Sequence, residues 1–479
     1  MSPDSIAARD IVIGAGPAGL TAALELTRLG YRPLVLEASA QIGGISRTEA
    51  YKGYLFDIGG HRFYTKVPEV EQLWHSLLNA DEFRTTPRLS RIYFDGKFYK
   101  YPLEIFDALG NIGVVESLRS LASYARARLT PHAAETTLEQ WVTNRFGRRL
   151  YERFFRTYTE KVWGVPCSKI GADWAAQRIQ GLSLHKTVWN ALTGGRGNTL
   201  KTLINEFKYP RCGPGMMWER AAAQIEARGG KIWRGARVAG LQTDGARIQA
   251  IQVECAGERQ TIPVRSLISS MPLSTLIGSI QPAPPDLIRT AASSLRYRDF
   301  LIVCLIIDQE RLFPDNWLYI HSPTVRVGRI QNFKNWSAEM VPDPSKTSLG
   351  MEYFCNRGDD LWTMADADLI ALASRELETL GLARARDVRD GIVIRQLAAY
   401  PFYDMDYQQN LAILRGYLAA FGNLQTVGRN GLHRYNNQDH SMLTGLLAAR
   451  NVAGGHNDLW DVNTERSYQE TWLVKDDTP

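Results

Sequence analysis

Residues 10–19 read DIVIGAGPAG, an apolar strand that runs into a glycine-rich turn, and an apolar helix follows from residue 20. Gly14 allows a tight turn, Gly16 lets the backbone reach a pyrophosphate, and Gly19 lets the helix pack on the strand. A second apolar strand ends at Glu37, whose carboxylate can accept hydrogen bonds from a ribose 2′-hydroxyl and repels a 2′-phosphate. The stretch therefore predicts a βαβ unit that binds a dinucleotide at a helix N-terminus.

The segment after Glu37 indicates which dinucleotide is bound. It contains Gly43, Gly44 and Arg47 in the order GGISRT. This order resembles the GGxxR[ST] segment of the glutathione-reductase-like flavoproteins. The resemblance implies that these three residues lie against the pyrophosphate of FAD. The motifs place only phosphate- and ribose-binding groups, so we expect FAD to be held without a covalent bond.

Later parts of the chain are expected to complete the cofactor domain. Strands are predicted near Val238 and over 248–253, and the superfamily resemblance implies that the backbone of Val238 holds adenine. A strand into a glycine turn is predicted at Leu424–Gly428. A helix capped by an aspartate or a serine should follow from Asp439 and direct N–H groups at the flavin pyrimidine.

The predicted fold class is α/β, with a Rossmann-type, glutathione-reductase-like FAD domain that is discontinuous in sequence. An α+β substrate domain and a helical subdomain are predicted beside this FAD domain. The substrate domain is expected to contain strands at Phe300–Ile307 and Ser348–Phe354 and a helix at Ala365–Leu380. The predicted segments are 1–85, 206–285 and 415–479 for the FAD domain, 86–205 for the helical subdomain, and 286–414 for the substrate sheet with its helix.

Four stretches carry a more specific resemblance. The chain is similar to the UDP-galactopyranose mutase family, within the wider group of amine oxidases and protoporphyrinogen oxidases. The matching stretches are Phe56–His61, Tyr158–Arg178, Trp317–Ser337 and Gly428–Ser441. In that family reduced FAD acts as a covalent catalyst through N5 at the anomeric carbon of a nucleotide sugar.

The resemblance implies a role for each matched residue. His61 would lie near the flavin N5, and several arginines would neutralise the leaving pyrophosphate. The sequence leaves open whether Tyr400 or Tyr403 joins those arginines. The implied catalytic group is His61, Arg178, Arg329, Arg434 and Tyr400. The further cofactor contacts implied are Gly60, His61, Gly428, Arg429, Asp439, His440 and Ser441.

The sequence also departs from the mutase pattern. The spacing before Asn437 is two residues shorter, and Trp336 stands where these mutases have a tyrosine. Residues 451–460 match no mutase segment. The galactose specificity is therefore not implied, and the sequence names neither the sugar nor the nucleotide.

Composition excludes several classes of protein. The net charge of +6 is spread along the chain without a basic block, which argues against nucleic acid as a partner. The five cysteines form no CxxC pair, so neither a cysteine metal site nor a disulfide framework is expected. We read no signal peptide and no membrane span, and expect a cytoplasmic protein. The amphipathic segment Glu116–Arg128 is expected to be a buried helix, with docking to a partner chain or a membrane surface as the alternative.

Three functions remain open from the sequence. The first is a mutase-like isomerase that needs reduced FAD, for which NADPH or NADH are compatible external reductants. The second is an FAD-dependent oxidase or desaturase of the protoporphyrinogen oxidase or amine oxidase type, acting on a less polar substrate. The third is a flavoprotein scaffold without turnover, which the presence of His61 and Arg47 disfavours. The sequence is compatible with an oligomer.

Overall fold

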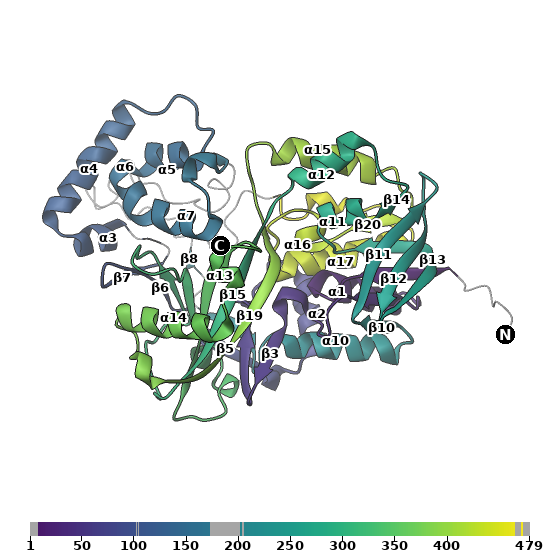
Figure 1. The fold of residues 1–479 in the computed structure, drawn as a ribbon, viewed down its shortest axis with the longest axis horizontal. Coiled ribbons are helices and arrows are strands. Elements are labelled where there is room, and N and C mark those ends of the chain that lie inside the picture. The colour runs from purple at the N-terminus through teal and green to yellow at the C-terminus, as the bar shows by residue number, and fades with distance from the viewer. Residues whose placement is uncertain are drawn as a thin grey trace, which may run out of the picture.

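The computed structural model describes residues 8–101, 103, 105–172, 202–203, 206–464 and 471–472. Two large sheets organise this part of the chain (Figure 1). The first has eight strands in the order β10-β2-β1-β13-β12-β11-β14, with β20 paired to β13. Its strands are β1 (Arg9–Ile13), β2 (Leu34–Glu37), β10 (Lys231–Arg234), β11 (Ala236–Thr243), β12 (Ile248–Cys255), β13 (Glu258–Ser269), β14 (Ile280–Gln281) and β20 (Leu424–Thr426).

The parallel part of the first sheet joins three distant pieces of sequence. Neighbouring strands within the set β10, β2, β1, β13 and β20 pair in parallel. Strand β12 pairs antiparallel with β13 on one side and with β11 on the other. Ile11 and Val12 at its centre are almost fully buried, as expected for a parallel strand covered on both faces. The predicted strands near the two chain ends therefore meet in one sheet, in a mixed α/β fold.

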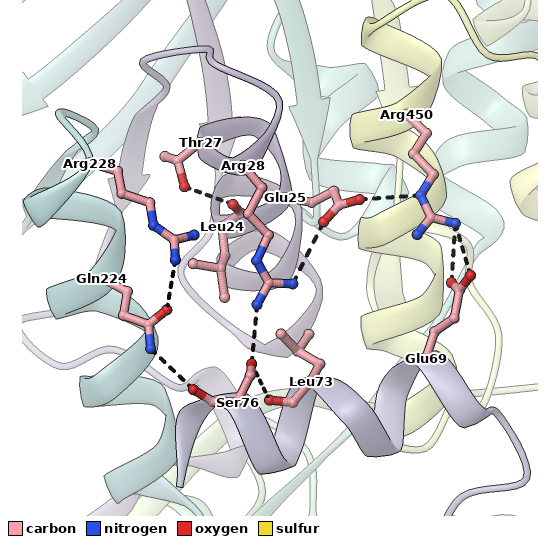
Figure 2. Close-up of polar contacts among 10 residues, drawn as sticks. All are labelled: Leu24, Glu25, Thr27, Arg28, Glu69, Leu73, Ser76, Gln224, Arg228 and Arg450. Carbon is pink, nitrogen blue, oxygen red and sulfur yellow. Dashed lines mark hydrogen bonds and ion pairs between the residues drawn. The ribbon is translucent and has the colours of Figure 1, made fainter.

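Four helices from the same pieces cover one side of this sheet: α1 (Pro17–Arg28), α2 (Pro68–Leu77), α10 (Gly215–Ala227) and α17 (Gln438–Val452). Figure 2 shows polar contacts that join them. Arg450 of α17 reaches Glu25 on α1 at 3.2 Å and Glu69 on α2 at 3.1 Å. Arg28 on α1 donates to the hydroxyl of Ser76 on α2 at 3.1 Å. The contacts fix how the helices lie beside one another.

Helices α1 and α17 approach each other closely. A Cβ on Gly445 would lie 2.3 Å from the carbonyl oxygen of Ala18, so only glycine fits there. The hydroxyl of Ser46 donates to the side-chain oxygen of Gln438 at 2.8 Å. The start of α17 is therefore held next to the segment that follows β2.

The second sheet has seven strands in the order β19-β15-β18-β17-β16-β6-β7. The long strand β15 reads YRDFLIVCLII and pairs with β18 and β19. It is buried along most of its length because its alternating side chains pack into a hydrophobic core on each face of the sheet. Helix α14 (Asp366–Thr379) packs on this sheet. The strands are β6 (Ser90–Phe94), β7 (Lys97–Lys100), β15 (Tyr297–Ile307), β16 (Trp317–Ile320), β17 (Arg329–Asn332), β18 (Thr347–Cys355) and β19 (Val388–Pro401).

Helices gather in the segment after β7. They are α3 (Ile105–Ile112), α4 (Val114–Leu129), α5 (Leu138–Phe146), α6 (Arg148–Leu150), η3 (Tyr151–Arg156) and α7 (Thr157–Trp163). Strands β6 and β7 precede them and belong to the second sheet. The exact division of the chain into domains stays a prediction.

Smaller elements connect these layers. Strands β3 and β4 form a hairpin, and β5 pairs with β9. Helices α11, α12 and α15 lie against the far part of the first sheet (Figure 1). Their bounds are β3 (Thr48–Tyr51), β4 (Tyr54–Asp57), β5 (Phe83–Pro87), β9 (Glu206–Pro210), α11 (Leu273–Gly278), α12 (Asp286–Ser294), α13 (Asp360–Thr363), α15 (Tyr407–Leu418) and α16 (Gly428–Gly431).

Helix α4 departs from the sequence expectation. Its buried residues are Ser120 and Ala127, whereas Val114, Leu118 and Leu129 are exposed. The prediction of a buried apolar face is therefore wrong, because the helix turns its small and polar side toward α5 and α6. Across the described residues, no helix has both the length and the apolar character needed to span a membrane, and no cluster of possible metal ligands occurs.

Candidate active site

The glycine-rich turn after β1 forms a narrow backbone cradle. Gly14 has a φ of +91°, and a Cβ on Gly19 would lie 1.8 Å from the Gly14 carbonyl oxygen. A Cβ on Gly44 would lie 3.1 Å from the Cα of Gly16, so these two glycine backbones are in contact. Gly16 is the N-cap of α1 and places no side chain over the first N–H groups of the helix. Such bare N–H groups bind phosphate, which fits the FAD pyrophosphate.

Two charged residues border this cradle. The Glu37 carboxylate at the end of β2 accepts from the backbone N–H of Ala15 at 2.7 Å and from that of Ser39 at 2.8 Å. The Arg47 guanidinium donates to the carbonyl of Gly44 at 2.9 Å and to the side chain of Gln396 at 2.8 Å. It also forms an ion pair with Glu49. Arg47 therefore links the Gly43–Gly44 turn to β19 in the second sheet.

Helix α17 begins beside the same cradle. It starts at Gln438 with Asn437 as its N-cap, and no side chain accepts a capping hydrogen bond there. The prediction of an aspartate or serine cap is therefore wrong, because the N-cap residue lies two residues before Asp439 and four before Ser441. Asp439, His440 and Ser441 instead occupy the first turn of the helix.

Two further predicted cofactor contacts lie elsewhere on the first sheet and at its edge. Val238 lies on β11, where the pairing with β12 shifts register between Val238 and Gly240. Gly428 begins α16 with a φ of +77°, and its N–H donates to the hydroxyl of Thr444 at 2.9 Å. That bond joins the glycine turn to α17.

His61 lies where the cradle meets the second sheet. Its Nε2 is 2.7 Å from the carbonyl of Ile45 and 2.9 Å from that of Ile58, so Nε2 carries the proton and donates. Burial lowers the pKa of His61 to about 4, and the nearby charges of Arg429 and Arg329 act in the same direction. The imidazole is therefore neutral near pH 7.

Gly60 brings the loop of His61 against the second sheet. A Cβ on Gly60 would lie 1.6 Å from the ring of Trp317 on β16. The Trp317 ring in turn lies 5.0 Å from the guanidinium of Arg329. The Trp317 ring thus lies next to both the loop of His61 and Arg329.

Arg329 is the central cation of this region. It sits opposite Glu352 in the pairing of β17 with β18, and their side chains form a close ion pair. A guanidinium nitrogen donates to the hydroxyl of Tyr400 at 2.6 Å. Burial alone would lower the pKa of Arg329, but Glu352 together with the neighbouring tyrosines outweighs it, and the pKa stands above its ordinary value. Arg329 is therefore a permanent cation with a carboxylate partner.

Aromatic side chains surround this ion pair. Tyr400 stacks on Tyr435 with ring centroids 5.5 Å apart, and the Arg429 guanidinium lies 4.8 Å from the Tyr435 ring. Burial raises the pKa of Tyr400 to about 12 and raises that of Tyr158 well above its ordinary value, so both phenols remain protonated. These hydroxyls are hydrogen-bond donors close to a cation, a combination that suits an anionic or oxygen-rich ligand.

The structure separates other predicted residues from this group. Tyr403 uses its hydroxyl to accept from the backbone N–H of Tyr435 at 2.7 Å, so Tyr400 is the tyrosine that contacts Arg329. Arg434 donates to the backbone carbonyls of Trp460 and of Val462, the latter at 2.7 Å. Arg178 lies outside the described residues.

Sequence reasoning missed three members of the site. Glu352 was not expected there, although a carboxylate inside the apolar strand β18 is itself a signal, because such a group needs a buried partner. Trp317 and Tyr435 were read only as parts of longer motifs. Trp336, by contrast, is a core residue that donates to the carbonyl of Asn316 at 2.9 Å.

Comparison with known proteins identifies the class. A crystal structure of reduced UDP-galactopyranose mutase superposes with a TM-score of 0.83 at 21% identity, covering 96% of this chain and 99% of that one. A Klebsiella pneumoniae protein described as a probable UDP-galactopyranose mutase is 25% identical over 171 residues, 34% of this chain and 43% of that protein. Phytoene desaturase (lycopene-forming) of Pantoea ananas is 24% identical over 265 residues, 51% of this chain and 52% of that protein. The chain thus spans about half or less of the length of the curated relatives it matches.

The nucleotide cradle, the fold and these similarities define an FAD-dependent enzyme. The model of the flavin containing amine oxidoreductase family matches residues 17–452, and the chain belongs to that family. Within it the chain resembles UDP-galactopyranose mutase in fold.

Proposed function

We propose that this enzyme is a nucleotide-sugar mutase-like isomerase that works with reduced FAD. The observation that carries the proposal is the position of Arg329. This buried cation is joined to the hydroxyl of Tyr400 and lies one indole ring away from the loop of His61. A diphosphate at Arg329 would place the attached sugar beside that loop, where the flavin is expected.

The residues of the chain have distinct tasks in this proposal. The backbone around Gly14, Gly16 and Gly43 holds the FAD pyrophosphate, and Glu37 holds its ribose. When bound and reduced, FAD supplies a nucleophilic nitrogen for the anomeric carbon. Arg329 and Tyr400 bind the diphosphate and stabilise the charge that develops as it leaves.

The protonation states limit what each residue does. His61 is neutral and donates through Nε2 to two carbonyls, so it orients the loop beside the flavin and does not supply a proton near pH 7. Tyr158 and Tyr400 stay protonated and can donate hydrogen bonds to phosphate oxygens. Arg429 lies over Tyr400 and Tyr435 and adds positive charge behind them.

A second candidate is an oxidase or desaturase for a less polar substrate. The ion pair with Glu352 favours it, because that carboxylate already balances the charge of Arg329. The rings of Trp317 and Phe354 also lie 5.0 and 4.7 Å from the guanidinium. A site with little net charge accepts an apolar substrate more readily than a site with a free cation.

Titration with UDP distinguishes the two candidates. Wild type, Arg329→Ala and Arg329→Lys are compared by flavin absorbance after reduction with dithionite, with NADPH and NADH tested as reductants. Arg395→Ala is the matched control, since Arg395 lies on β19 of the same sheet and pairs with Asp366. The mutase proposal expects UDP binding that weakens at least about 30-fold in Arg329→Ala, recovers partly in Arg329→Lys because a point charge lacks the planar fork, and is unchanged in Arg395→Ala.

Product analysis completes the test. UDP-, GDP- and dTDP-sugars are incubated with the reduced enzyme and examined for ring-contracted isomers. Equal UDP binding by wild type and Arg329→Ala, or no nucleotide binding at all, contradicts the mutase proposal. Oxygen- or quinone-dependent oxidation of an apolar substrate would then support the second candidate.

A further inference from the structure

Helix α4 presents apolar side chains to solvent. Val114, Leu118 and Leu129 are 78%, 62% and 83% exposed, and Val115 and Leu121 are 63% and 39% exposed. Globular proteins rarely leave a contiguous group of large apolar residues uncovered without an interaction to cover it. This group is therefore the strongest sign of an interaction surface outside the candidate active site.

The exposed residues form one stripe along the helix. Val114, Leu118, Leu121 and Leu129 follow helical spacing and share a face. The opposite face holds the buried Ser120 and Ala127. The helix is thus anchored to the protein by its small residues and keeps its large apolar residues outside.

Positive charge flanks the apolar stripe. Arg119, Arg126 and Arg128 are exposed on α4, on the two sides of the stripe. The one carboxylate of the helix, Glu116, is only 22% exposed; it is paired with Arg149 on the neighbouring helix α6 and lies 3.8 Å from Arg119, whose side chain stays 63% exposed. The exposed face therefore combines apolar side chains with arginines and carries no carboxylate of its own.

We propose that α4 docks on the surface of an anionic lipid bilayer, lying flat with the stripe in the interface. Leucine and valine would enter the boundary between head groups and acyl chains, and the arginines would bind lipid phosphates. Figure 1 places α4 at the outer edge of the molecule, away from the first sheet, so the flavin-binding part does not obstruct the approach.

The charge pattern favours lipid over a second copy of this chain. A two-fold contact through α4 would bring its arginines near those of the other copy, with no exposed carboxylate on this face to compensate. An anionic bilayer supplies the missing negative charge.

Vesicle sedimentation tests the proposal on the whole FAD-bound protein. Vesicles of phosphatidylcholine alone are compared with vesicles that contain phosphatidylglycerol, at low and high salt. The variants are Val114→Ser with Leu118→Ser, and Arg119→Glu with Arg126→Glu. The matched controls lie on α12, where Leu287 is 65% exposed and the side chain of Arg289 is 57% exposed; they are Leu287→Ser and Arg289→Glu.

The expected result is binding to the anionic vesicles that falls at high salt and is at least about tenfold weaker with neutral vesicles. Each α4 double variant should lose at least about tenfold in partitioning, with unchanged FAD content, while the α12 controls bind as wild type. Three results would overturn the proposal. They are no vesicle binding by wild type, binding by the α4 double variants that equals that of wild type, or a wild-type dimer in solution that the double variant Val114→Ser with Leu118→Ser dissociates.

Discussion

The Arg329 guanidinium forms an ion pair with Glu352, its cross-strand neighbour, and the two side chains are 11% and 0% exposed. The carboxylate receives one further hydrogen bond, from the side chain of Gln331 at 2.8 Å. A buried pair of this kind is costly to break, because the remaining charge is left without a partner. We therefore expect the pair to influence both the stability of this region and its affinity for an anionic ligand.

Replacing Glu352 by Gln should separate these two effects. Glu352→Gln leaves Arg329 as an uncompensated buried cation, so unfolding free energy should fall by about 3 kcal/mol. UDP should bind more tightly, because the competing carboxylate is gone. Urea unfolding and UDP titration measure the two results.

Glu376→Gln is the control for Glu352→Gln. Its carboxylate is also buried and accepts from the backbone N–H of Val327 at 3.0 Å and from the hydroxyl of Tyr353 at 3.0 Å. The Glu376→Gln variant should be less stable than wild type and should bind UDP no more tightly. Weaker UDP binding in Glu352→Gln would contradict the model in which this carboxylate competes with the ligand.

The pH dependence of stability should contain a contribution from Asp57. Burial raises the pKa of Asp57 to about 7, against 3.8 in the unfolded chain, although Tyr209 and Thr48 donate to it. The folded state keeps a proton that the unfolded state has lost between these pH values, so this carboxyl reduces stability as pH rises from about 4 to 7. The loss amounts to as much as about 4 kcal/mol and stays constant above pH 7.

Asp57→Asn isolates this contribution, because it cannot ionise. The difference in unfolding free energy between Asp57→Asn and wild type should shift in favour of the variant from pH 4.5 to pH 8. The buried histidines His61 and His433, whose pKa values are about 4, influence both proteins alike. A difference that does not change with pH would refute the assignment.

His61→Ala should retain FAD and change the reactivity of the flavin. The side chain follows the pyrophosphate cradle without belonging to it, and it ties the carbonyls of Ile45 and Ile58 together. Loss of that donor should cost about 1–3 kcal/mol of stability. Flavin absorbance gives the FAD content, and stopped-flow reduction with dithionite gives the reactivity.

His433→Ala provides the comparison for His61→Ala. His433 is buried and lies 3.2 Å from the carbonyl of Phe402. The His433→Ala variant should be less stable than wild type, and its rate of flavin reduction should be unchanged. If His61→Ala folds but is purified without FAD, His61 holds the cofactor and does not tune the reactivity of the flavin.

Gly60→Ala should disrupt the contact between the His61 loop and the second sheet. Its Cβ would overlap the Trp317 ring, which is packed in the core and cannot withdraw freely. We expect a loss of about 3 kcal/mol or more and a lower FAD content. Gly278→Ala is the control, since no atom lies within 4 Å of its added Cβ. Similar melting temperatures for both variants would show that the loop adapts.

Much of the fold could be predicted from local pattern. Phe300–Ile307, Ser348–Phe354 and Ala365–Leu380 were expected as two strands and a helix, and β15, β18 and α14 occupy those positions. The glycine-rich turn after β1 could be predicted as well, because its glycines form a single local turn. Long strand β19, which carries Tyr400, was not predicted.

Pairing between distant strands could not be predicted from local pattern. The register of β17 with β18 decides that Arg329 meets Glu352, and neither strand encodes its partner. The face of α4 was misassigned for a related reason. Helical spacing identifies a stripe of leucines and valines, but only the small residues against α5 and α6 decide which side faces the protein.

The contact between Ser46 and Gln438 has a consequence for biosynthesis. Ser46 and Gln438 leave the ribosome far apart in time, because β20 and α17 are synthesised only after every strand of the second sheet. A nascent chain that ends before Leu424 lacks the strand beside β13 and the helix against α1. The contacts around the glycine-rich turn are therefore complete only after α17 has been synthesised, and we expect chains truncated before Leu424 to bind no FAD.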